Sequence, residues 1–465
     1  MKYDTVIIGA GMSGLAAGIR LAHFDKKVLI CERHYREGGL NSYYDRNNFK
    51  LETGLHAMTN FVPRGAPKSM PLMKILRQLK IPYDALELRE QRGSSIVFPG
   101  HMLEFSNDYA EFLQSVAEQF PAEMDNLNRL DRFIVEHDAT RMENGYISAR
   151  KVIGEYITDP LLTDMILCPL MYYGSANERD MDLAQFVLLY RSVFHEGFCR
   201  PASNGIEHII KLLKQRYQES GGELRLNCGI SSIKSSSGKV CAVETATGEI
   251  IETDHVLSSA GAFETFSICE EKLFGEMLPL EGQLAFMESM VIPRADFDFK
   301  TDKTIVFFNN ADSFDFSNPL DMCDYRSGII CFPHNFKFNM EDSPPEKMLR
   351  VSLLANSRAW HTMSKEEYAE NKKTIALRAV RIAESVLGLK DDVLDGARLT
   401  DSFTPRTVTR FTGKINGAIY GSPTKYKDGR TGIDGLYLCG TDQGFLGITG
   451  AMLSGISIAN TYLML

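Results

Sequence analysis

The feature that most constrains this chain is a glycine-rich loop close to its first residue. Residues 9–14 read GAGMSG, which is the GxGxxG pattern. An apolar run at 3–8 precedes the loop, residues 14–21 have helical spacing, and a second apolar run follows at 27–31. The first glycine permits a tight turn, the second lets backbone approach a pyrophosphate, and the third allows a helix to pack closely on a strand. The sequence therefore predicts a parallel β-α-β unit with an anion site at the start of its helix.

An acidic residue and a second glycine turn narrow the expected ligand. Glu32 follows Gly9 by 32 − 9 = 23 residues and ends the second strand. An acidic side chain at this position accepts hydrogen bonds from the ribose hydroxyls of a dinucleotide. Residues 37–42, EGGLNS, then add a glycine turn for which a simple NAD site has no need. A long flavin diphosphate needs this additional close backbone, so we expect FAD.

A second set of cofactor features lies at the far end of the chain. Residues 435–442 predict a strand and a turn that carries Asp442, a residue suited to binding a ribityl hydroxyl. Gly447 to Gly450 then begin a helix whose N-terminus can stabilise negative charge on a flavin. Residues 444–465 carry no charge and are long enough to cross a bilayer, but they contain four glycines. A buried helix packed closely on a ligand is therefore the preferred interpretation.

Composition excludes several classes of partner. The chain has 51 basic and 60 acidic residues, a net charge of −9, which argues against nucleic acid as a partner. Its nine cysteines form no Cys-x-x-Cys pair and its ten histidines show no ligand spacing, so we expect reduced thiols, a cytoplasmic location and no metal. A mildly basic loop near residues 63–76 is the candidate for peripheral contact with the inner face of a membrane. The oligomeric state is not predicted.

The order of segments predicts two interleaved domains. Cofactor features occur at the start, near residues 204–260, and at the end, whereas residues 83–200 are mainly helical in pattern and 285–354 alternate as broad antiparallel strands. Two separate strands are expected at 249–253 and 256–259. The predicted fold class is α/β: a Rossmann-like FAD-binding domain (1–82, 202–275 and 405–465) interleaved with an α+β substrate domain (83–201 and 276–404). The substrate domain is expected to contain an antiparallel sheet and a helical insertion.

The whole chain resembles the carotenoid (phytoene) desaturase, carotenoid isomerase and retinol saturase-like family of FAD-dependent oxidoreductases. The resemblance rests on GAGMSG, on Glu32-Arg33 with the Gly38-Gly39 turn, on residues 49–56 (FKLETGLH), on Thr404-Pro405, and on the closing GLYLCGTDQGFLGITGAMLSG. It implies FAD as cofactor and a long apolar polyene or related lipid as substrate. Glu52 stands where the family usually has aspartate.

The resemblance also implies which residues line the cofactor. By position these are Gly9, Gly11, Ser13, Gly14, Glu32, Arg33, Gly38, Gly39, Leu40, Asn41, Ser42, Ile230, Gly440, Thr441, Asp442, Gly447, Ile448, Thr449 and Gly450. Ile230 resembles the position whose backbone meets the adenine. His56 is placed near the flavin ring and is the candidate catalytic acid or base, with a purely structural role as the alternative. His195 and Glu196 are predicted to form a solvated helix end.

These features predict an enzyme that acts on carbon–carbon bonds. FAD can take a hydride from saturated carbon or return it to a double bond. An apolar substrate is bound mainly by burial, and the aromatic runs at 171–173, 186–190 and 307–308, with Phe332, are candidates for tunnel walls or for ordinary core. Desaturation or saturation of an isoprenoid is the leading hypothesis. A flavin-dependent non-redox isomerase is the first alternative, and an amine oxidase on the same fold is the second. The single Trp360 lies outside the terminal cofactor motif, and no segment matches an amine-binding aromatic cage.

Overall fold

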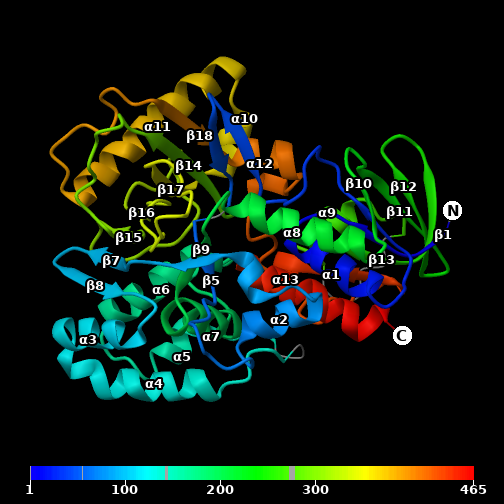
Figure 1. Cartoon of the computed structure of the whole chain (residues 1–465), viewed down its shortest axis with the longest axis horizontal. Coiled ribbons are helices and arrows are strands. Elements are labelled where there is room, and N and C mark those ends of the chain that lie inside the picture. The colour runs from blue at the N-terminus through cyan, green and yellow to red at the C-terminus, as the bar shows by residue number, and fades with distance from the viewer. Residues whose placement is uncertain (1, 55, 142–144, 272–277, 465) are drawn as a thin grey trace.

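Two sheets organise the molecule, one on each side of the view in Figure 1. The computed structural model describes residues 2–54, 56–141, 145–271 and 278–464. The first sheet gathers strands from widely separated parts of the chain in the order β10-β2-β1-β13-β12-β11, and β19 also pairs with β13. These strands are β1 (Lys2–Ile8), β2 (Val28–Cys31), β10 (Glu223–Arg225), β11 (Ile230–Ser236), β12 (Lys239–Thr245), β13 (Ile250–Ser258) and β19 (Leu436–Leu438).

The pairing in the first sheet explains where a ligand can bind. β1 pairs in parallel with β2 and with β13, and β19 pairs in parallel with β13. The carboxyl ends of these four strands therefore meet at one edge of the sheet, where open α/β sheets bind their ligands. Strands from the start, the middle and the far end of the chain thus build a single edge.

Helices with small-residue faces pack against this sheet. α1 (Met12–Ala22) is buried along almost its whole length, since its alanines and glycines allow neighbours to approach closely. α8 (Ile206–Glu219) and α13 (Gly447–Ile458) pack against α1, and α2 (Pro71–Leu79) contacts both α1 and α13. Together they enclose an apolar core that includes Leu15, Ile210 and Met452.

The second sheet is mostly antiparallel and runs in the order β18-β14-β17-β16-β15-β7-β8. Only the β7–β15 pair within it is parallel. α11 (Lys365–Leu387) covers one face; it begins with a capping box between Ser364 and Glu367 and ends at Gly388 in the left-handed region. The strands are β7 (Ser94–Phe98), β8 (His101–Phe105), β14 (Ala285–Ile292), β15 (Ile305–Asn309), β16 (Ser327–Cys331), β17 (Leu349–Ala355) and β18 (Leu399–Phe403).

A helical layer covers the other face of the second sheet (Figure 1). It consists of α3 (Tyr109–Gln119), α4 (Met124–Glu136), α5 (Ala149–Ile153), α6 (Pro160–Gly174) and α7 (Leu183–Tyr190). α7 widens into a π-helical turn, Arg191–His195, which leads into β9 (Phe198–Pro201). β9 pairs with β5 (Met58–Thr59) and β6 (Leu88–Glu90), so the chain that follows the second glycine turn is joined to the helical layer.

The remaining elements are short. None of the described helices combines the length and the apolar character needed to cross a bilayer. The other helices and strands are β3 (Tyr43–Arg46), β4 (Phe49–Glu52), α9 (Ala262–Ser267), α10 (Ser357–Thr362), α12 (Pro405–Thr412), η1 (Tyr83–Leu86), η2 (Pro121–Glu123), η4 (Ile415–Gly417), η5 (Gly440–Gln443) and η6 (Ala459–Leu463).

The predicted α/β class is confirmed, with differences in detail. The two strands expected at 249–253 and 256–259 are one strand, β13, because its first half pairs with β12 while its second half pairs with β1 and β19. The stretch 83–200 is mainly helical, but it also contains the β7–β8 hairpin, which turns at Gly100 in the left-handed region and joins the second sheet. The domain boundaries remain a prediction.

Candidate cofactor site

The two glycine turns lie directly against each other. The backbone N–H of Gly38 donates to the carbonyl of Ala10 at 2.9 Å. Gly38 and Gly39 have φ of +111° and +61°, values that favour glycine, and a Cβ on Gly39 would stand 3.3 Å from Cα of Gly11. The second turn therefore extends the backbone surface of the first, as the FAD hypothesis requires.

The first loop leaves the start of α1 open. A Cβ on Gly14 would stand 2.1 Å from the carbonyl oxygen of Gly9, so only glycine fits there. By contrast, no described atom lies within 4 Å of a Cβ on Gly11, and within the described chain no side chain caps α1. The first N–H groups of α1 are thus available to an anionic ligand such as a pyrophosphate.

Glu32 is fixed beside this loop at the carboxyl end of β2. Its Oε2 accepts from the backbone N–H of Ala10 and its Oε1 from that of His34, both at 2.8 Å. A carboxylate has further lone pairs, which remain suited to ribose hydroxyls. The carbonyl of Glu32 also accepts from the backbone N–H of Cys228 at 2.8 Å, which brings the segment entering β11 next to Glu32; Ile230 follows two residues later. Arg33 is exposed.

The far end of the chain completes the same site. A Cβ on Gly455 would stand 2.0 Å from the carbonyl oxygen of Ser13, so α13 crosses α1 with backbone in contact. At the start of α13, Gly447 has φ of +68°, and no described atom lies within 4 Å of a Cβ placed on it. The hydroxyl of Thr449 donates to the carbonyl of Thr59 at 3.4 Å. The N-terminus of α13 is therefore a second helix N-terminus with open space in front of it, and it lies next to the loop that follows the glycine turns.

Asp442 joins three segments of the chain. It is buried, and its carboxylate accepts from the backbone N–H of Ser422 at 2.8 Å and from that of Ala262 at 2.5 Å. Nζ of Lys425 lies 3.5 Å from Oδ1 of Asp442. Burial lowers the pKa of Lys425 to about 8, against the opposing effect of the Asp442 charge. The role of Asp442 toward a ribityl hydroxyl stays a prediction; in the structure the residue orders the backbone around the turn.

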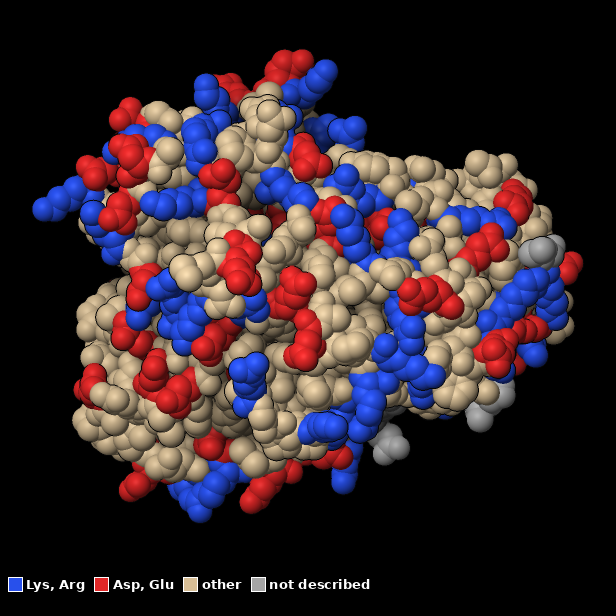
Figure 2. Space-filling model, viewed as in Figure 1, with Lys and Arg blue, Asp and Glu red and all other residues tan. Residues whose placement is uncertain are grey.

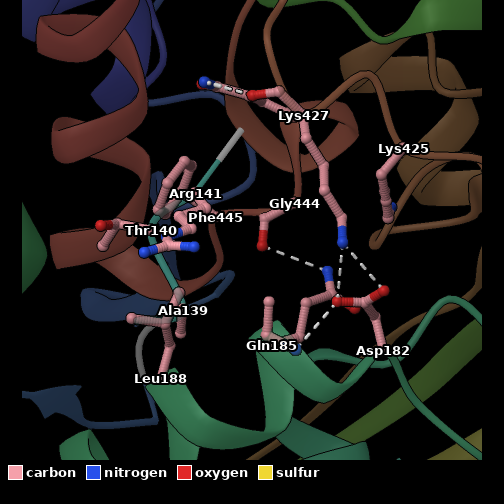
Figure 3. Close-up of a pocket in the computed structure, with 12 residues that line it drawn as sticks. Ala139, Thr140, Arg141, Asp182, Gln185, Leu188, Lys425, Lys427, Gly444 and Phe445 are labelled. Atoms are coloured by element: carbon pink, nitrogen blue, oxygen red, sulfur yellow. Dashed lines mark hydrogen bonds and ion pairs between the residues drawn. The ribbon is translucent and has the colours of Figure 1, made fainter. Parts of the chain in front are cut away.

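A small, open hollow lies between α7 and the chain that enters α13 (Figure 3). Across it Nζ of Lys427 lies 3.0 Å from Oδ2 of Asp182, and Nε2 of Gln185 donates to the carbonyl of Gly444 at 3.1 Å. Leu188 and Phe445 supply apolar walls. The polar contacts tie the helical layer to the cofactor-binding end of the chain.

His56 reaches away from the glycine turns, toward the second sheet. Its Nε2 lies 2.9 Å from Oε2 of Glu288 on β14 and 3.0 Å from Oγ of Ser352 on β17. Glu288 and Ser352 face each other in the β14–β17 register, so the sheet fixes their separation. The candidate catalytic histidine thus stands at the junction of the cofactor-binding loops and the second sheet.

Glu288 belongs to a buried ion pair with Arg350. Burial alone raises the pKa of a carboxyl group, but the charges of Arg350 and then of His56 outweigh it, so the pKa of Glu288 is below its usual range. Nη2 of Arg350 also donates to the carbonyl of Glu52 at 3.1 Å. The pair therefore links the sheet to β4.

Glu52 continues this network into α8. Its Oε1 accepts from the backbone N–H of Ile206 at 2.7 Å, and its Oε2 accepts from Nη2 of Arg200 at 2.6 Å. A Cβ on Gly205 would stand 1.9 Å from Oε1 of Glu52. Glu52 thus caps α8 from a distant segment. Nε and Nη1 of Arg200 are buried, and in the described part of the chain they have no hydrogen-bond partner.

Sequence reasoning did not identify Glu288, Arg350, Ser352 or Arg200. The available signal was one acidic and one basic residue in two otherwise apolar strands, since buried charges in strands are normally paired. Glu196 was also misjudged. Its Oε2 accepts from Nδ2 of Asn60 at 2.7 Å, and burial raises its pKa, because the π-helical turn directs this end of α7 inward. The expected solvated helix end is therefore wrong; Nε2 of His195, in turn, lies 2.7 Å from Asp131.

The comparisons with known proteins agree with this geometry. The sequence profile of the family described as flavin containing amine oxidoreductase matches residues 12–462. The chain is 23% identical to a chloroplastic prolycopene isomerase of Arabidopsis thaliana, over 98% of this chain and 82% of the relative. It is also 23% identical to an all-trans-retinol 13,14-reductase of Danio rerio, over 99% of this chain and 87% of the relative.

Solved structures share the fold. An oxidoreductase of Methanosarcina mazei aligns with a TM-score of 0.65 at 16% identity, covering 99% of this chain and all of that one. A putrescine oxidase with bound putrescine aligns with a TM-score of 0.54 at 15% identity, covering 99% of this chain and 98% of that one. The open helix starts at Gly11 and Gly447, the adjoining glycine turns and the fixed Glu32 carboxylate fit FAD. The chain belongs to the flavin-containing amine oxidoreductase family and is an FAD-dependent oxidoreductase.

Proposed function

We propose that this enzyme desaturates or saturates carbon–carbon bonds of a long apolar substrate of the isoprenoid or carotenoid type. The observation that carries the proposal is the position of an aromatic cluster, which includes Tyr172, Phe186, Tyr190, Phe194 and Phe307, between the second sheet and the helical layer. The same cluster contains Ala57, next to His56, and Leu446, next to the start of α13. Apolar surface therefore extends up to both cofactor-binding segments.

Contacts around Ala57 and Leu446 show how closely the cluster adjoins the site. The Tyr173 hydroxyl donates to the carbonyl of Ala57 at 2.5 Å, and a Cβ on Gly174 would stand 2.3 Å from Leu446. Phe308 and Phe332, by contrast, pack beneath α11 on the other face of the sheet. We therefore keep three of the candidate tunnel walls: residues 171–173 on α6, residues 186–190 on α7, and Phe307 on β15.

These positions give each part of the site a distinct role in the proposed reaction. FAD supplies the capacity to take a hydride from saturated carbon or to return one to a double bond. The starts of α1 and α13 bind and stabilise negative charge, and Glu32 orients the ribose. The aromatic cluster binds the apolar chain and excludes water, at about 25 cal/mol per Å² of apolar surface buried. His56 is the group that holds or moves a proton.

Non-redox isomerisation of double bonds is a second candidate function. It is favoured by the similarity to prolycopene isomerases, which extends over 98–99% of the chain. Oxidation of amines is less supported. Trp360 is fully buried beneath α11, where its Nε1 donates to the carbonyl of Met322, so it contributes no wall beside the cofactor-binding segments.

Incubation of the flavin-loaded protein with cis and trans polyenes tests these functions. Mass spectrometry of the products separates the outcomes: desaturation removes two hydrogens, saturation adds two, and isomerisation leaves the mass unchanged. Flavin absorbance, followed in the same samples without oxygen, reports net electron transfer. Unchanged polyenes together with peroxide release from amines would replace the proposal with an amine oxidase.

We also propose a cytoplasmic protein that contacts the inner face of a membrane through α2 and the loop before it. Between Glu52 and Asp84 the chain has no acidic residue, yet it carries five exposed basic residues: Arg64, Lys68, Lys74, Arg77 and Lys80. Figure 2 shows Lys and Arg gathered over the region of α2. Anionic lipid headgroups attract such a segment, even though the whole chain is acidic.

A further inference from the structure

We propose that Glu288 is a positioning residue that fixes the ring of His56 with a proton on Nε2, which makes Nδ1 the atom that exchanges a proton with the substrate. The exchange with a substrate rests on the proposed function. The positioning of the ring does not, because it follows from contacts within the protein.

Both neighbours of Nε2 act as hydrogen-bond acceptors. Oε2 of Glu288 lies 2.9 Å from Nε2, and an ionised carboxylate can only accept. The Ser352 hydroxyl already donates to Oε2 of Glu288 at 3.1 Å, so its oxygen presents lone pairs to Nε2 at 3.0 Å. In this arrangement the hydrogen of the imidazole belongs on Nε2.

Arg350 keeps Glu288 in its ionised form. Its guanidinium pairs with Oε1 of Glu288 and leaves Oε2 for His56 and Ser352. Both members of the ion pair are almost completely buried, at 1% and 2% side-chain exposure, so water does not compete for the carboxylate.

Nδ1, the other ring nitrogen of His56, is free for proton transfer. In the described part of the chain, Nδ1 of His56 has no hydrogen-bond partner, and the side chain is 20% exposed. The next residue, Ala57, belongs to the aromatic cluster, so the ring stands at the edge of the apolar region assigned to the substrate. A buried dyad with one anchored nitrogen and one free nitrogen is the arrangement that general acid–base catalysis uses.

The proton transfer balances without an oxidant. The π electron pair of a substrate double bond forms a C–H bond with the proton of Nδ1, which leaves a delocalised carbocation and a neutral imidazole. Return of a proton from carbon to the lone pair of Nδ1 restores the double bond and the imidazolium. Glu288 gains no proton in either direction. Removing such an acid–base group typically slows a reaction by about 100-fold or more.

Nitrogen NMR of the flavin-loaded protein, labelled with ¹⁵N-histidine, tests the positioning directly. The His56→Asn variant assigns the His56 signals. The expected result is that neutral His56 carries its proton on Nε2. In Glu288→Gln the amide oxygen is expected to pair with Arg350 and the amide NH₂ to face Nε2, so the proton should move to Nδ1. A proton on Nδ1 in the wild type, or a tautomer that Glu288→Gln leaves unchanged, would overturn the proposal.

Two further variants keep the test decisive. Glu384→Gln is the matched control, because Glu384 is also buried and paired with an arginine, Arg381, but lies on α11 away from His56. It is expected to leave the His56 signals unchanged. If Glu288→Gln does not fold, Glu288→Asp retains the charge but withdraws it from Nε2, and the preference of the proton for Nε2 is expected to weaken.

Activity measurements separate the two parts of the proposal, the positioning of the His56 ring and its proton transfer to the substrate. With an active polyene, His56→Asn is expected to lower the rate about 100-fold while the bound FAD, measured by its absorbance, is retained. If no polyene reacts but Nε2 carries the proton, the proposed function fails and the positioning stands. If polyenes react and His56→Asn leaves the rate unchanged, the proton-transfer role of His56 fails.

Discussion

The backbone of Ser13 touches that of Gly455, so closely that a Cβ on Gly455 would stand 2.0 Å from the Ser13 carbonyl oxygen. This contact sets the distance between α1 and α13, the two helices proposed to meet the cofactor with their N-termini. Because backbone cannot move aside easily, Gly455→Ala is expected to cost at least about 1–3 kcal/mol of unfolding free energy and to reduce bound FAD. Urea denaturation and flavin absorbance measure the two effects. Gly154→Ala is the control, since its Cβ would meet neighbours only at 3.4 Å and beyond.

A substitution of Glu32 tests whether its carboxylate contributes to FAD binding. Glu32→Gln keeps the shape of the side chain but removes the charge and replaces one acceptor by an NH₂ donor facing backbone N–H groups of Ala10 or His34. We expect FAD affinity to fall at least about tenfold, since a hydrogen bond to a charged group contributes about 1.5–3 kcal/mol. Titration of the apoprotein with FAD, followed by flavin fluorescence, gives the affinity. Glu223→Gln, a more exposed glutamate of β10, should bind FAD as the wild type does.

Removal of Arg350 is expected to destabilise the protein in a pH-dependent way. The pKa of Glu288 is below its usual range in the folded chain, so its ionised form contributes stability above about pH 4.3, and that contribution is lost as the pH falls further. Arg350→Leu leaves this carboxylate buried without its guanidinium and should cost about 3–5 kcal/mol at pH 7.

Burial then raises the pKa of Glu288 in the Arg350→Leu variant, so acid protonates it more readily in the folded chain. The difference from wild type in unfolding free energy should therefore shrink between pH 7 and pH 4.5. Arg381→Leu serves as the comparison, because that guanidinium is 52% exposed and its loss should cost at most about 1 kcal/mol. A difference for Arg350→Leu that does not vary with pH would contradict the account of Glu288.

The buried amine of Lys425 predicts a further rise of stability with pH, in the alkaline range. Burial lowers its pKa to about 8 in the folded chain, whereas an unfolded lysine titrates near about 10.4. Between these values the unfolded chain binds the extra proton, so folding stability rises with pH. The unfolding free energy of the wild type, relative to Lys425→Met, should increase from pH 8 to pH 10. Lys300→Met provides the comparison: this amine is exposed and its hydrogen bond to Asp298 raises its pKa, so no such increase is expected.

Reversal of three charges on α2 and at its end tests the membrane proposal. Each basic residue near an anionic surface contributes about 1 kcal/mol, so Lys74→Glu, Arg77→Glu and Lys80→Glu together should weaken binding to vesicles with anionic lipid by about 100-fold or more. Sedimentation with vesicles of zwitterionic lipid alone should show little binding for either protein. Lys365→Glu, Lys372→Glu and Lys373→Glu on α11 form the control, with the same charge change elsewhere. Equal binding by both triple variants would show that α2 has no specific role.

The fold class and the FAD cofactor could be predicted because their signals are local. The GxGxxG loop, Glu32 and the Gly38-Gly39 turn lie within one β-α-β unit and the turn that follows it, and their spacing reflects the geometry of that unit. The β7–β8 hairpin was missed for the opposite reason. Its first strand, β7, begins with polar Ser94 and Ser95, which are buried where β7 pairs with β15 from a distant segment.

The charged network around His56 could not be read from the sequence for a related reason. His56 and Ser352 are 296 positions apart, and Glu52 and Arg200 are 148 apart. The register of β14 on β17 brings Glu288 opposite Ser352, and no local pattern specifies that register. Opposite charges in two apolar strands indicate that a buried pair exists, but they do not identify the histidine that shares it.

The contact between α1 and α13 has a consequence for synthesis on the ribosome. α1 emerges early, whereas α13, which packs on its small-residue face, is translated only after the second sheet and the helical layer. Until then α1 leaves part of an apolar, glycine-rich surface uncovered, and the nascent chain lacks the second of the two open helix starts. Stable capture of the cofactor is therefore expected to be a late event, and chains that stall before α13 should be the natural clients of chaperones and proteases.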